Sequence, residues 1–172
     1  MNSLISRNII RAVFVLFIQL VLLKRINITI GDFNYIHLTI YPVIILLLPY
    51  SLPRPLTILI AFLIGLFVDI FYDSIGVHAG ACTMVAFARY YILAFIAPTN
   101  GYKNPALTSY QYGVSWLLSY LALFLFIHLF TLYSLEAFSF VYITEIALRT
   151  IFSFMASLFL VMIGYLIFNP KY

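Results

Sequence analysis

The chain has 172 residues, of which 65% are hydrophobic and 8% charged, and its formal net charge is +4. Five acidic and nine basic residues cannot supply the charged surface that a soluble domain of this size needs, whereas lipid accepts apolar side chains on every face. The positive charge is small and scattered, which is typical of residues that set the orientation of a membrane protein and not of a nucleic-acid-binding surface. Composition therefore predicts a single integral membrane domain.

Six apolar stretches follow one another along the chain, each near the ~20 residues that a membrane-spanning helix requires. The first carries Arg7 and Arg11 before its apolar run, as a signal peptide does, but it lacks a small-residue cleavage site and ends at Lys24 and Arg25. This favours an uncleaved first span. The second stretch is the shortest. We expect an all-α transmembrane domain over residues 1–172, with helices at approximately 3–23, 35–50, 55–73, 77–97, 114–133 and 142–168.

Lysine and arginine residues in alternate loops predict the orientation of such a bundle. Turn-forming segments at 27–34, 49–55 and 98–105 separate the predicted helices. The side of the membrane with more basic residues is expected to be cytoplasmic, which places both termini there. That side carries Arg7, Arg11, Arg54, Lys103 and Lys171, and the other carries Lys24 and Arg25.

Several isolated polar residues favour structural roles. Cys82 is a single thiol in an apolar run, so it predicts neither an internal disulfide nor a metal site. His78 and His128 stand alone, which favours hydrogen-bonded packing residues over ligands or proton carriers. Tyrosines expected at the membrane interface or in helix packing are Tyr41, Tyr50, Tyr90, Tyr91, Tyr133 and Tyr142.

Ionisable side chains inside a bilayer cost at least ~2.5 kcal/mol each, so each one predicts a partner or a function. Asp69 and Asp73 are four residues apart and share a helix face with Gly65. At 1.5 Å per residue, Asp69 and Arg149 both lie about 7–10 Å below the outer surface, so an ion pair between them is geometrically plausible. We interpret these charges as fixing helix packing, in preference to transport or catalysis. The expected intramembrane network is Asp69, Arg89, Glu145 and Arg149.

Small residues favour close helix contact in the same region. Gly76 and Gly80 form a GxxxG motif, which lets membrane helices approach one another. We expect Gly65, Asp69 and Asp73, together with these two glycines, to form a structural or partner-binding site.

The spacing of Gly65, Asp69 and Asp73 also resembles GxxxDxxxD, the second half of the signature of CDP-alcohol phosphotransferases. Those enzymes hold divalent metal with carboxylates from two helices. The upstream half is absent, and Asp32, the only acid before Asp69, is expected in a loop. The sequence contains no Ser/His/Asp set, HExxH, Walker loop or cysteine nucleophile. We therefore expect no enzymatic activity, no metal and no cofactor.

The segment from Pro49 to Arg89 resembles MreD, the membrane protein of the bacterial rod-shape system. A proline-bearing turn leads into an apolar helix carrying Gly65-Leu66-Phe67-Val68-Asp69, and Gly76 follows in a short turn. The next helix begins with small residues at Gly80-Ala81. The resemblance extends loosely over the whole chain, through its length, its six predicted spans and its lack of soluble loops.

The resemblance implies a non-enzymatic adaptor of the elongasome, the machinery for peptidoglycan synthesis that controls cell shape, in the bacterial inner membrane. The implied partners are MreC, the MreB cytoskeleton, a RodA-type glycosyltransferase and a penicillin-binding transpeptidase. The family is also similar in fold to the substrate-binding subunits of energy-coupling-factor transporters. The alternative is therefore a membrane subunit that holds a small molecule near the outer face.

The sequence leaves open whether such an adaptor is a scaffold or also binds a lipid-linked precursor. Our hypothesis is that Asp69, Gly65 and the turn from Gly76 to Gly80 fix a rigid hairpin that docks an MreC-like single-span partner.

Overall fold

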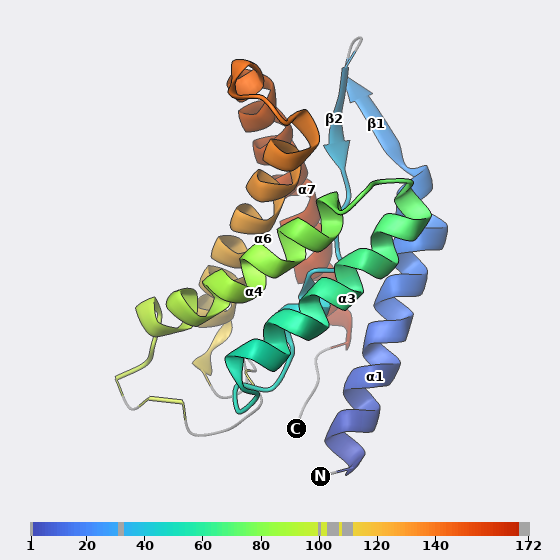
Figure 1. Ribbon diagram of the computed structural model, residues 1–172. Coiled ribbons are helices and arrows are strands. Elements are labelled where there is room, and N and C mark those ends of the chain that lie inside the picture. Colours follow the sequence, from blue (N-terminus) through green and yellow to red (C-terminus); the bar gives the residue numbers. More distant parts are fainter. Residues whose placement is uncertain (1, 31–32, 100, 103–106, 108–111, 169–172) are drawn as a thin grey trace.

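The computed structural model describes residues 2–30, 33–99, 101–102, 107 and 112–168. It is mostly helical, with one two-stranded hairpin (Figure 1). The elements are α1 (Asn2–Phe17), the π-helical turn η1 (Ile18–Leu22), the 3-10 turn η2 (Leu23–Arg25), β1 (Asn27–Ile30), β2 (Phe33–His37), α2 (Val43–Leu46), α3 (Arg54–Tyr72), α4 (Val77–Phe95), α6 (Val114–Ala137), η3 (Phe140–Tyr142) and α7 (Ile143–Phe168).

The four long helices pack in sequence order. α3 packs on α4, α4 on α6 and α6 on α7, and α7 then contacts β2. Figure 1 shows α1 and the β hairpin beside this row, with the described starts of α1 and α3 at the same end of the molecule. The short helix α2 contacts α1, α3, α4 and α6, so it lies between them.

Three of the described helices are long and apolar enough to cross a membrane: α3, α6 and residues 143–165 of α7. The sequence predicts six spans. α4 is less apolar, and α1 has 16 residues before its helical geometry changes. Many large apolar side chains on the outside of the bundle are exposed, which suits lipid better than water. They include Ile10, Phe17, Leu59, Ile70, Phe95, Ile151 and Phe159.

The second predicted helix, over residues 35–50, is wrong. β2 occupies its start, the chain stays non-helical to Pro42, and α2 has only four residues. An apolar run of this length fits a buried strand as well as a helix, because hydropathy reports burial and not backbone conformation. Proline supplies no amide hydrogen and disfavours helix in the residue before it, so Pro42 prevents a continuous helix.

The predicted loop over residues 27–34 also differs. It contains all of β1 and the start of β2, which pair antiparallel with Asn27 opposite His37. Of the residues that carried expectations, Asp32, Lys103 and Lys171 lie outside the described part of the chain.

Gln19 supplies partners to the non-helical segment that follows β2. The Gln19 side chain is 2% exposed. The buried backbone of the segment after β2 needs hydrogen-bond partners from the protein. Gln19 Oε1 accepts the Ile40 amide at 2.8 Å, and Nε2 donates to the Leu38 carbonyl at 3.1 Å. Nε2 also donates to the Tyr72 hydroxyl at 2.8 Å. One amide side chain therefore joins η1, the segment after β2 and the end of α3.

Two serines of α7 supply further partners to the same segment. Ser153 Oγ accepts the His37 amide at 3.0 Å, and Ser157 Oγ accepts the Thr39 amide at 2.9 Å. Both serines are fully buried and stand four residues apart, so they share one face of the helix. Extended backbone is therefore accommodated inside the bundle because side chains of other elements replace the missing strand partners.

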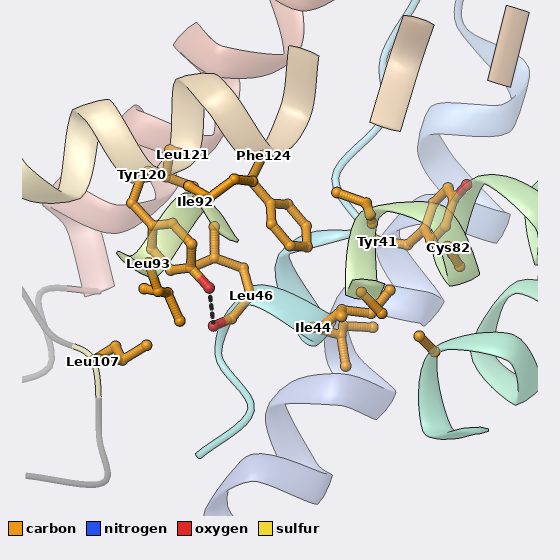
Figure 2. Packing of buried hydrophobic residues seen from close by; sticks show 14 of the residues in the cluster. Tyr41, Ile44, Leu46, Cys82, Ile92, Leu93, Leu107, Tyr120, Leu121 and Phe124 are labelled. Atoms are coloured by element: carbon orange, nitrogen blue, oxygen red, sulfur yellow. Dashed lines mark hydrogen bonds between the residues drawn. The ribbon is translucent and has the colours of Figure 1, made fainter. Parts of the chain in front are cut away.

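The largest apolar cluster surrounds α2. Figure 2 shows Tyr41, Ile44 and Leu46 from this segment beside Cys82, Ile92 and Leu93 of α4 and Tyr120, Leu121 and Phe124 of α6. The Tyr120 hydroxyl donates to the Leu46 carbonyl at 3.5 Å. The core is therefore built around a short irregular segment that the long helices enclose.

We predict that Ser157→Ala lowers the free energy of unfolding by about 1–3 kcal/mol, because it leaves the buried Thr39 amide without an acceptor. The matched control is Ser119→Ala. Ser119 is exposed and, within the described residues, its hydroxyl bonds to the Ser115 carbonyl of its own helix, so its loss is expected to change stability by less than ~0.5 kcal/mol. Unfolding in detergent, followed by circular dichroism, measures both. Equal stabilities would contradict this account of the segment.

Candidate functional site: the capped α3–α4 hairpin and the buried polar groups

Gly65 marks the closest approach of α3 to α4. A Cβ atom added to Gly65 would lie 2.5 Å from Ala79 Cα and 2.6 Å from the His78 carbonyl oxygen. Both neighbours are backbone atoms and cannot rotate away. Glycine is therefore required at this position for the start of α4 to rest against α3.

Asp69 caps the N-terminus of α4, the helix that packs closely against Gly65. Its carboxylate accepts the His78 amide at 3.0 Å and the Ala79 amide at 2.9 Å, which are orphan donors of the first turn of α4. It also accepts the Ser74 hydroxyl at 2.6 Å. The residue before a helix usually supplies such a cap, but here that residue is Gly76, which has no side chain to do so. Asp69, at 4% exposure, performs this role from the preceding helix.

The turn between the helices uses two left-handed backbone conformations. Asp73, at φ 53°, ends α3, and Gly76, at φ 80°, begins α4. The Asp73 side chain is exposed. Gly80 lies on a different face, where an added Cβ would meet Leu135 of α6 at 2.8 Å. The predicted GxxxG motif therefore serves two roles, a turn at its first glycine and an α4–α6 contact at its second.

The ion pair between Asp69 and Arg149, which the sequence left open, does not form in this structure. Arg149 instead contacts Glu145, one turn before it on α7, at 2.7 Å and Glu136 at the end of α6 at 3.5 Å. Asp69 forms no ion pair within the described part of the chain, since its carboxylate oxygens receive backbone and hydroxyl donors. The expected four-residue network is thus divided, with Glu145 and Arg149 in one place and Asp69 in another.

Arg89 lies apart from both groups, near the other end of α4. Its side chain is 5% exposed, with Nε donating to the Tyr120 hydroxyl at 2.9 Å and Nη2 donating to the Leu48 carbonyl at 2.5 Å. No carboxylate pairs with this guanidinium among the residues that the structure describes.

Tyr41 joins the two buried histidines. Its hydroxyl lies 2.8 Å from His78 Nδ1 and 2.8 Å from His128 Nε2, and its side chain is fully buried. A hydroxyl has one proton, so Tyr41 donates to one imidazole and accepts from the other. The predicted role of the histidines as hydrogen-bonded packing residues is confirmed. His128 Nδ1 has no hydrogen-bond partner within the described structure.

His37 lies at the end of β2, near the ion pairs of Arg149. Burial lowers its pKa below the usual 6.5; Glu136 raises the pKa and Arg149 lowers it, both to a smaller extent than burial. The imidazole therefore resists protonation, and its ring packs beside Tyr133 with centroids 6.4 Å apart.

Sequence reasoning missed the residues that pair with the non-helical segment. Gln19 in the first apolar run carried a usable signal, because an amide inside a predicted span needs a partner. Ser153 and Ser157 carried another, because their spacing of four residues places two hydroxyls on one helix face. Within the described chain, no three histidine, cysteine or carboxylate side chains are grouped to hold a metal ion.

Comparisons with protein-family models, with curated proteins and with solved structures found no match to this chain.

We predict that Gly65→Ala lowers the free energy of unfolding by about 1–3 kcal/mol, because its methyl group must displace the backbone of α4. Gly164→Ala is the control: Gly164 lies inside α7 with no atom within 4 Å of its added Cβ, so alanine is expected to stabilise that helix by about 0.5–1 kcal/mol. Thermal unfolding of the purified proteins measures both changes. An unchanged stability for Gly65→Ala would show that the two helices do not approach at this point.

Proposed function

We propose that this chain is a multi-pass adaptor of the bacterial inner membrane, similar to MreD, with both termini in the cytoplasm. In this role it links an MreC-like protein and the MreB cytoskeleton to a RodA-type glycosyltransferase and a penicillin-binding transpeptidase. It performs no chemistry itself. The resemblance of residues 49–89 to that family is the origin of the proposal.

The observation that best supports an adaptor is the way Asp69 and Gly65 fix the α3–α4 hairpin. The Asp69 carboxylate accepts hydrogen bonds from the Ser74 hydroxyl and from two amides in the first turn of α4. These bonds give it a structural role in fixing the geometry of the hairpin. A substrate or ion would instead need a polar group left available in a pocket. A hairpin held in one geometry suits recognition by another protein.

The outer end of this hairpin presents apolar side chains. Ile75, in the turn, is fully exposed, and Ile70, in the last turns of α3, is 70% exposed. Exposed apolar groups beside a rigid turn are typical of docking surfaces, and a single membrane-spanning helix is a partner that a lipid-facing surface can accept. Further exposed residues of α3 on its lipid side are Leu59, Leu63, Leu66 and Phe67.

The alternative, a small-molecule-binding subunit of a transporter of the energy-coupling-factor type, requires a ligand near the outer face. The cavity of about 340 Å³ in this structure lies instead along the first half of α3, from Leu52 to Ile64, and Asp69 does not line it. The adaptor therefore remains the leading proposal. The following experiment distinguishes it from a transporter subunit.

We predict that the tagged chain, purified from its native membranes in mild detergent, carries an MreC-like protein and wall-synthesis enzymes, identified by mass spectrometry. Replacing Ile70 and Ile75 together by alanine is expected to reduce MreC recovery several-fold, because both side chains are exposed at the proposed docking end. Ile151→Ala, at an exposed position of α7, is the matched control and should retain the partner.

Recovery of an ATPase pair with a coupling subunit would replace the adaptor with the transporter alternative. Recovery of neither set, from membranes that contain both, would contradict the proposed function.

A further inference from the structure

A cavity of about 340 Å³ lies between α1, α2 and α3. Its volume falls in the ~300–1,000 Å³ range of small-molecule pockets. The lining is apolar except for Arg11, and apolar cavities of this size do not hold water stably. The lining residues that the argument uses are Ala12 and Val15 of α1, Ile44 and Leu47 of α2, and Ile60 and Ile64 of α3.

The cavity has the depth of one membrane leaflet. Leu52, just before α3, lines one end and Ile64 the other. From Arg54 to Ile64 the helix rises about 15 Å at 1.5 Å per residue, which is half of the ~30 Å hydrocarbon thickness of a bilayer. An acyl chain that enters from one membrane surface can therefore lie along this space.

A second, smaller cleft of about 10 Å³ adjoins the first, and Leu52 lines both. Arg54 and Arg89 are among the residues that line this cleft. The Arg54 guanidinium carbon stacks 3.2 Å from the centre of the Tyr90 ring, which holds it beside the cleft. Neither arginine forms an ion pair within the described residues.

The charges of the described chain are separated between its two ends. Asp69 and Asp73 lie near the end of α3, and Glu136 and Glu145 lie at the end of α6 and the start of α7. These elements meet at the end of the molecule opposite Arg54, because α3, α4, α6 and α7 run alternately up and down (Figure 1). The Arg54 end thus carries guanidinium charge with no nearby carboxylate from the described residues, which favours binding of an anion.

We propose that this end of the protein binds one anionic phospholipid of the surrounding leaflet. One acyl chain fills the cavity between α1 and α3, and the phosphate binds the guanidinium group of Arg54 at its mouth. Arg89 contributes positive charge from the buried side. Basic pockets between membrane helices bind anionic headgroups by the same combination of charge and apolar contact.

The test is native mass spectrometry of the full-length protein in neutral detergent, titrated with phosphatidylglycerol or with phosphatidylcholine of identical acyl chains. We expect wild type to retain one phosphatidylglycerol at least tenfold better than phosphatidylcholine. Arg54→Gln should weaken phosphatidylglycerol retention about fivefold and leave phosphatidylcholine unchanged. Arg25→Gln, at an exposed arginine beyond the other end of α1, is the charge control and should behave as wild type.

A second pair of variants tests the acyl-chain cavity. Ala12→Phe places a ring in the cavity and should reduce retention of both lipids at least tenfold, whereas Val13→Phe, at the neighbouring exposed position, should not. Labelling of wild type by phosphatidylglycerol with a photoreactive acyl chain needs no substitution and should modify the peptides containing residues 12–15 and 60–64. Equal retention of the two lipids by wild type, or labelling spread evenly over the helices, would overturn the proposal.

Discussion

A backbone amide or carbonyl that is removed from water must find its partner inside the protein, and this requirement explains the main features of the structure. At the start of α4 the partner is the Asp69 carboxylate, supplied across the hairpin because Gly76 cannot supply one. In the segment after β2 the partners are Gln19, Ser153 and Ser157. Each polar side chain buried at these points replaces a backbone partner that regular secondary structure would otherwise provide.

These local pairings also set the arrangement of the helices. Gln19 reaches both the buried segment and Tyr72, so η1 is connected to the end of α3. The serines connect α7 to the same segment. The two ends of the bundle consequently differ: the Asp69 end holds the capped hairpin and the ion pairs of Arg149, and the Arg54 end holds guanidinium groups beside an apolar cavity. Protein docking is proposed for the first end and lipid binding for the second.

The sequence predicted the long helices within a few residues, because apolar runs bounded by proline and glycine fix their extent. It also singled out Gly65 and Asp69, since a glycine and an acid one turn apart on a membrane helix require an explanation. It misassigned residues 35–50, because hydropathy alone does not distinguish a buried strand from a helix. From depth alone it could only leave an ion pair between Asp69 and Arg149 open. Counting charges overlooks backbone amides, and the Asp69 carboxylate accepts two amides at the start of α4.

Hydrogen–deuterium exchange of the full-length protein in lipid nanodiscs tests this account of buried backbone most directly. Residues 38–48 have little regular secondary structure, so in water their amides would exchange rapidly. If the partners seen here protect them within the bilayer, this segment should exchange as slowly as the middle of α3 and α6. Exchange of residues 38–48 as fast as that of an exposed loop would show that the segment lies outside the bundle, and would contradict the central claim.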